Sequence, residues 1–267
     1  MLWFNFRVWD YTSIDNVNPK MFPNGVADFK SFSEDAAKQG LRLSTHRMSG
    51  GLDPRDPDYC VKPSPGLLTW ANMTLSTPAS ASALSITTTP PPGLKPPTEL
   101  EQRNGKSSTC SIDEEYVQFT SISTLPNGDW KLSLQGGVKR NYSAGTVVRC
   151  YVKGNLYFLP DAMSDLYEEV AVRYAKFSNL IGFQDGSFDG AGWFGWYGRW
   201  AFYKVRMCMA FSRVAFAHVP GVFVNTFSLA VDTSSRLWCT RISTTLPQST
   251  PAGFWCRPVG RNTASTR

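Results

Sequence analysis

The segment 166–200 constrains the fold of this chain more than any other part of the sequence. It begins with a helical pattern whose apolar side chains share one face: Leu166, Val170, Tyr174 and Phe177. Ser164 stands where an N-cap is expected. A short strand pattern follows and ends at Asp189-Gly190. A helix that leads into a strand is the repeating step of an α/β sheet, so we expect Asp189 at the carboxyl end of a strand.

A second helix–strand step lies near the N-terminus. Residues 25–39 carry apolar side chains near helical spacing: Val26, Phe29, Phe32 and Ala36. Gly40 follows at the position where a helix often turns into a left-handed residue. Residues 41–46 then alternate like a strand that ends at His46. We interpret this segment as another unit of the same α/β architecture.

Residues 67–158 have a different character, rich in Ser, Thr, Gly and Pro. They contain short alternating runs such as DWKLSLQ and GTVVRCYV, separated by turn signals such as Pro126-Asn127-Gly128-Asp129. This pattern predicts a small antiparallel β domain inserted between residues 1–66 and residues 159–236. Both flanking segments are expected to belong to one α/β unit.

The sequence after Asp189 predicts a further helix at 200–217 and a strand at 222–231 that ends before Asp232. Residues 237–267 lose this periodicity and read as an irregular tail. No basic and apolar leader precedes the first strand-like residues. We therefore expect a fragment of a longer protein, extracellular or surface-associated if that protein is exported.

The composition and charge of the chain limit the classes of partner that we expect for it. The net charge of +6 comes from scattered Lys and Arg residues, so we expect no nucleic-acid partner, whereas an anionic glycan fits the charge. No apolar run reaches the roughly 18 residues of a membrane span, and no membrane partner is expected. The sequence lacks phosphate-loop, dinucleotide-binding, zinc-protease and α/β-hydrolase motifs, so we expect no cofactor.

Cysteine and asparagine patterns leave alternatives open. The six cysteines contain no CxxC pair, which argues against a zinc ribbon, and disulfides and free buried thiols remain equally compatible. The two histidines, His46 and His218, make no metal-ligand spacing. Asn72-Met73-Thr74 and Asn141-Tyr142-Ser143 match the glycosylation sequon, which is used only in a eukaryotic secretory route.

The order of these elements, together with LYEEVAVRYAKFSNLIGFQDGSFDGAGW at 166–193, resembles TIM-barrel carbohydrate-active enzymes. The likeness is to large polysaccharide-degrading proteins in which a β domain interrupts the barrel. It extends over residues 22–235 and is specific only at 164–192. It implies an α/β fold, a partial (β/α)8 TIM-type barrel with an inserted small antiparallel β domain, and a glycoside-hydrolase-like activity. The chain departs from the pattern FDGxE at Gly192, where the pattern has a glutamate.

By this resemblance Asp189 is the nucleophile or the group that stabilises positive charge on the sugar. Hydrolysis needs a second carboxyl group at about 5–9.5 Å, and Asp232 is the best available partner. The structural alternative for each is a turn aspartate. Both carboxylates are thus candidates for the hydrolysis of glycosidic bonds in a polysaccharide.

Substrate contacts are expected from a loop of aromatic residues spaced by glycines. Sugar rings stack on aromatic planes, and Arg side chains pair with uronate or sulfate. The candidate substrate-binding residues are His46, Trp193, Trp196, Tyr197 and Arg199. Two other functions remain open: a polysaccharide lyase with His46 or Tyr197 as its base, and a non-catalytic carbohydrate-binding or structural protein.

Overall fold

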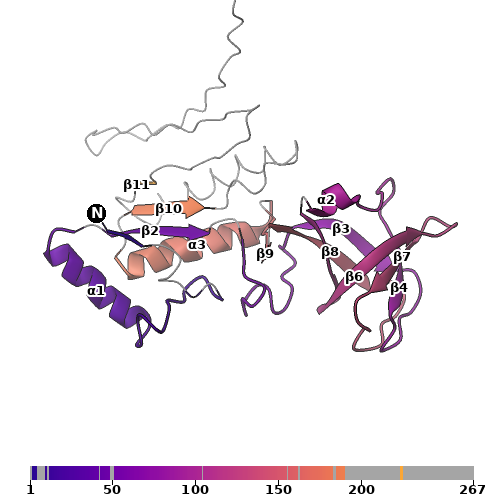
Figure 1. Cartoon of the computed structure of the whole chain (residues 1–267), viewed down its shortest axis with the longest axis horizontal. Coiled ribbons are helices and arrows are strands. Elements are labelled where there is room, and N and C mark those ends of the chain that lie inside the picture. Colours follow the sequence, from indigo (N-terminus) through magenta and orange to yellow (C-terminus); the bar gives the residue numbers. More distant parts are fainter. Residues whose placement is uncertain are drawn as a thin grey trace, which may run out of the picture.

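The computed structural model describes residues 2–4, 10, 12–41, 43–48, 51–103, 105–154, 156–161, 163–182, 185–189 and 223–224. These residues form two sheets at opposite ends of the molecule in Figure 1. One is a four-stranded parallel sheet in the order β1-β2-β10-β11. The other is a seven-stranded antiparallel sheet in the order β3-β4-β7-β6-β5-β8-β9.

Six strands of the antiparallel sheet close into a barrel, because β3 pairs with β8 as well as with β4. The strands are β3 (Thr69–Leu75), β4 (Ser85–Thr89), β5 (Lys106–Ile112), β6 (Glu115–Thr124), β7 (Trp130–Leu134) and β8 (Val147–Gly154). A short β9 (Tyr157–Phe158) extends β8 beyond the barrel. Closure leaves no unpaired strand edge in the ring, which removes the usual site of edge-to-edge aggregation.

Alternation of side chains fills the interior of the barrel. In β7 the side chains of Trp130, Leu132 and Leu134 are buried, while those of Lys131 and Ser133 lie outside the core. This period of two is what the run DWKLSLQ predicts for a strand with one face in the core. The disulfide Cys110–Cys150 joins β5 to β8 within the same core.

The parallel sheet consists of β1 (Leu2–Phe4), β2 (Leu43–Met48), β10 (Asp185–Asp189) and β11 (Phe223–Val224). Its helices are α1 (Val26–Lys38), which precedes β2, and α3 (Asp165–Leu180), which precedes β10. A short exposed α2 (Glu99–Arg103) belongs to the barrel region instead. The helix–strand order at both places is that of parallel α/β units.

Helix α3 connects the two ends of the molecule (Figure 1). Its first three turns pack Leu166, Val170 and Tyr174 into a cluster with barrel residues such as Tyr151. Its last turn places Phe177 in a second cluster with α1 and β2. The apolar face predicted for this helix is confirmed, and the structure shows that it serves two cores.

The ends of these helices agree with the sequence pattern, with one difference. Gly40 follows the C-cap of α1 and has φ 72, so the predicted left-handed residue is confirmed. Ser164 is the N-cap of α3 but makes no side-chain cap bond. Its Oγ lies instead 2.7 Å from the Asp161 carbonyl and 3.2 Å from the Gly66 carbonyl, which ties the helix start to the chain entering the barrel.

The predicted fold class is wrong. A (β/α)8 barrel closes eight parallel strands, each followed by a helix, whereas the barrel in this structure closes six antiparallel strands. The described part contains three helices and a parallel sheet of four strands beside that barrel. The resemblance to TIM-barrel carbohydrate-active enzymes is therefore overturned as well. The sequence contained true helix–strand steps, but two steps do not determine whether a parallel sheet closes.

Candidate functional site

The candidate site lies at the carboxyl edge of the parallel sheet. Asp189 is the last residue of β10 and pairs in register with Met48, the last residue of β2. His46 pairs with Ser187, two positions before Asp189. From the spacing of strands and residues in a sheet, the Cα atoms of His46 and Asp189 are about 8 Å apart. Two of the predicted site residues therefore lie on neighbouring strands near one edge.

The remaining predicted site residues lie outside the described residues. They are Asp232, Trp193, Trp196, Tyr197 and Arg199. The pairing of Asp189 with Asp232 and the aromatic substrate surface therefore stay predictions. The strand end at Asp189 is confirmed, but its catalytic role stays a prediction too.

A close contact between the two helices positions β10. Gly182 follows Ile181, the C-cap of α3, and has φ 74, a left-handed conformation that favours glycine. A Cβ atom at this position would lie 2.8 Å from the Ser33 Oγ of α1, so only glycine fits without a shift. Ile181 beside it is fully buried against Phe29 and Leu43. The chain is thus held between helix and sheet just before it enters β10.

Sequence reasoning missed a polar cluster around Arg173 on α3. Its Nε lies 2.8 and 2.9 Å from the two carboxylate oxygens of Asp15, and its Nη1 lies 2.6 Å from Asp58 Oδ2. Its guanidinium lies 5.6 Å from the centre of the Tyr59 ring, and the Tyr59 hydroxyl donates to Glu169 at 2.9 Å. No signal in the sequence identifies these partners, because Asp15 is 158 residues from Arg173 and Asp58 is 115.

The charged form of Arg173 is stabilised by its partners in this cluster. Burial works against the charged form, but hydrogen bonds with Tyr59, Asp15 and Asp58 raise the pKa of Arg173 above its ordinary value. The guanidinium accordingly anchors two loops to the connecting helix. We assign Arg173 a structural role, because its guanidinium already pairs with the carboxylates of Asp15 and Asp58.

The loop 52–66 contains two buried carboxylates. Asp53 accepts two hydrogen bonds at 2.9 Å from the Arg55 guanidinium, and these bonds lower the pKa of Asp53. Asp56 Oδ1 accepts the backbone N–H groups of Asp58 and Tyr59, while burial raises the pKa of Asp56. Both carboxylates stabilise turns of the loop, so neither is a free acid or base.

The junction between the loop and the barrel holds one free thiol. Cys60 is fully buried, and burial raises the pKa of its thiol well above the ordinary value. Burial also lowers the pKa of nearby Lys153, whose ammonium lies 4.9 Å from the centre of the Phe158 ring. A thiol kept protonated in this way is a poor nucleophile, so we assign it to the core.

Metal binding finds no support in the described part of the chain, where no three His, Cys, Asp or Glu side chains are grouped to hold an ion. Within the same residues, no helix combines the length and apolar character that crossing a membrane requires. Comparison with known proteins gives no family: no protein-family model matches this chain. No sequence among the curated proteins matches it either.

Proposed function

We propose that this protein hydrolyses glycosidic bonds of a polysaccharide at the carboxyl edge of its parallel sheet. Asp189 is the reacting carboxylate in this proposal, and Asp232 is its partner. The substrate is an oligosaccharide or polysaccharide chain, neutral or anionic. His46 and the aromatic segment that follows Asp189 in the sequence supply the contacts to the sugar.

The observation that carries the proposal is the position of Asp189 at the end of a parallel strand. In open parallel sheets, ligands bind outside the carboxyl ends of the strands. Asp189 ends β10 beside the end of β2, the strand that contains His46. A carboxylate and an imidazole near one such edge can share a sugar as ligand, because both groups bind hydroxyls and exchange protons.

Glycoside hydrolysis requires the two carboxyl groups to play different roles. In hydrolysis one carboxyl group protonates the leaving oxygen, and the other attacks the sugar or activates water. Asp189 would serve as the nucleophile or as the stabiliser of the positive charge that develops on the ring. Asp232 would act as the proton donor.

The test is incubation with a panel of neutral and anionic polysaccharides, with reducing ends and unsaturated uronate measured in parallel. We expect reducing ends without unsaturated product, and a loss of about 10²–10⁴-fold in Asp189→Asn. Asp185→Asn is the matched control, since Asp185 begins the same strand and pairs with Ser44 at the opposite end of the sheet. Its activity should equal that of the wild type.

Two outcomes would replace the proposal. Unsaturated uronate among the products would indicate a lyase, with His46 as the first candidate for its base. If folded protein yields neither reducing ends nor unsaturated uronate but is retained on a polysaccharide column, the result would indicate a carbohydrate-binding protein. Equal loss of activity in both aspartate variants would remove Asp189 from the reaction.

A further inference from the structure

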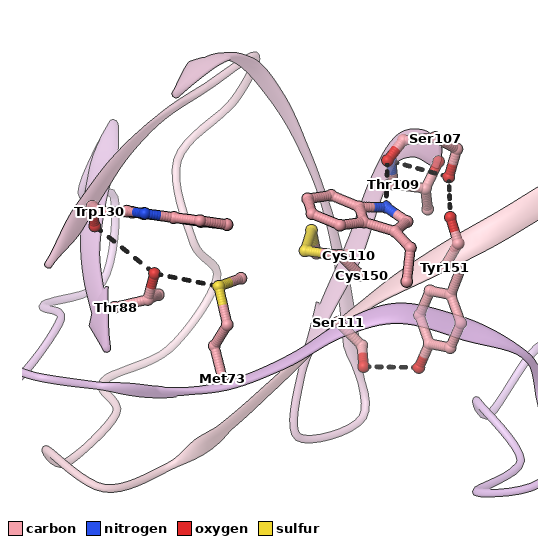
Figure 2. Close-up of a disulfide and its surroundings, with 10 residues drawn as sticks. Met73, Thr88, Ser107, Thr109, Cys110, Ser111, Trp130, Cys150 and Tyr151 are labelled. Atoms are coloured by element: carbon pink, nitrogen blue, oxygen red, sulfur yellow. Dashed lines mark hydrogen bonds between the residues drawn. A yellow bond between two sulfur atoms is a disulfide. The ribbon is translucent and has the colours of Figure 1, made fainter. Parts of the chain in front are cut away.

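The barrel contains a disulfide, Cys110–Cys150, that joins two of its strands. Cys110 and Cys150 lie directly opposite each other on β5 and β8, and both are fully buried in the barrel core (Figure 2). Disulfides of this structural kind form and persist in exported proteins and in the secretory pathway, and they are rare in reducing compartments. The secretory pathway of eukaryotes is also where asparagine residues in sequons receive glycans.

The first sequon, Asn72-Met73-Thr74, lies in β3. Asn72 and Thr74 are exposed, whereas Met73 between them is buried in the barrel. Figure 2 shows the Met73 side chain inside the barrel, where its sulfur accepts a hydrogen bond from Thr88 Oγ1 at 3.4 Å. The backbone pairings of β3 with β4 and β8 set this register, and a slip of one residue would bury Asn72 instead.

The second sequon, Asn141-Tyr142-Ser143, lies between β7 and β8 and has the same pattern. Asn141 and Ser143 are exposed, and Tyr142 is buried. The Tyr142 hydroxyl donates to Glu115 Oε2 at 2.7 Å and accepts from Arg140 Nε at 2.9 Å. These bonds hold the middle residue inward, so the acceptor asparagine stays at the surface.

The side chain of Asn141 is compatible with an attached sugar. Its Oδ1 accepts the backbone N–H of Ala81 at 2.8 Å. A glycan is joined to the other atom of the amide, Nδ2, and the carbonyl oxygen remains an acceptor. Glycosylation therefore leaves the bond to Ala81 in place.

We propose that Asn72 and Asn141 are N-glycosylation sites of this barrel. The donor is an oligosaccharide joined to a lipid through a diphosphate. The bond between its anomeric carbon and the diphosphate oxygen breaks, and a bond from that carbon to Nδ2 forms. Nδ2 gives up one proton, and the lipid diphosphate leaves with the electron pair. No oxidant or reductant takes part in this transfer.

The first test is peptide mass spectrometry on the protein enriched from the cells that encode it. Treatment with peptide N-glycosidase in heavy-oxygen water converts a glycosylated asparagine to labelled aspartate. We expect label at Asn72 and Asn141, and a Cys110–Cys150 peptide that separates only after reduction. Unlabelled, unmodified peptides at both asparagines would overturn the proposal, whatever the state of the cysteines.

The second test uses variants of the full chain, made with a secretion leader in a eukaryotic host. Ser143→Ala and Thr74→Ala each destroy one sequon and keep its asparagine, so each should remove one glycosidase-sensitive mobility step. Ser143→Thr and Thr74→Ser keep the sequons and should retain both steps. No described hydrogen bond uses the Ser143 hydroxyl, so its variants test glycosylation without disturbing the fold. Mobility steps unaffected by either alanine variant would contradict the assignment.

Discussion

Reduction of Cys110–Cys150 should lower the free energy of unfolding by about 4 kcal/mol. The two cysteines are 40 residues apart in sequence. The chain-entropy expression for a closed loop of that length gives about 13 cal/mol/K, which is about 4 kcal/mol at room temperature. The bond lies within the hydrogen-bonded ring, so the native contacts remain when it opens and the effect falls mainly on the unfolded chain.

The assay is urea unfolding of protein that has been refolded with and without reductant. With a slope of about 1–3 kcal/mol per molar urea, the midpoint should fall by about 1–4 M on reduction. A double variant, Cys110→Ala with Cys150→Ala, is the control, and reductant should shift its midpoint less than it shifts the midpoint of the wild type. Equal midpoints for oxidised and reduced wild-type protein would refute the reasoning, because loop entropy would then contribute nothing.

Two further predictions concern the backbone and the response to acid. Gly137→Ala should destabilise the protein by about 1–3 kcal/mol, because its Cβ would lie 2.7 Å from the Ser82 carbonyl oxygen. Gly136→Ala meets nothing within 4 Å and should stay within about 0.5 kcal/mol of wild type in the same urea titration. Arg55 lowers the pKa of Asp53 in the folded state. The stabilisation that this ion pair contributes is therefore fully present at a pH above the pKa of Asp53 in the unfolded chain. It is lost as the pH falls through the pKa of Asp53 in the folded protein. The gap in unfolding free energy between wild type and Arg55→Ala should therefore narrow from about pH 7 to about pH 2, and a constant gap would contradict the assigned pair.

Local structure could be predicted from the sequence where one element determines its own pattern. The apolar face of α3, the left-handed Gly40 and the strand end at Asp189 all follow from spacing or residue type, and the structure confirms them. The alternation DWKLSLQ likewise predicted the buried face of β7. Each of these features depends on residues that are close in the chain.

Features that join distant residues could not be predicted in this way. Barrel closure requires β3 to pair with β8, and register shifts near Thr69 and Lys106 have no marker in the sequence. Because this closure could not be read from the sequence, the two helix–strand steps favoured a (β/α)8 barrel, which is the wrong one. The partner of Cys110 and the cluster around Arg173 were missed for the same reason, since both depend on contacts across the fold.

The account depends most on the closed antiparallel barrel, and cross-strand nuclear Overhauser contacts test it directly. In a closed ring β3 has a partner on each side. We predict contacts between Met73 and Val148 on one side, and between Thr74 and Thr89 on the other, in the same sample. Contacts from β3 to β4 alone would show an open sheet and would contradict the fold described above.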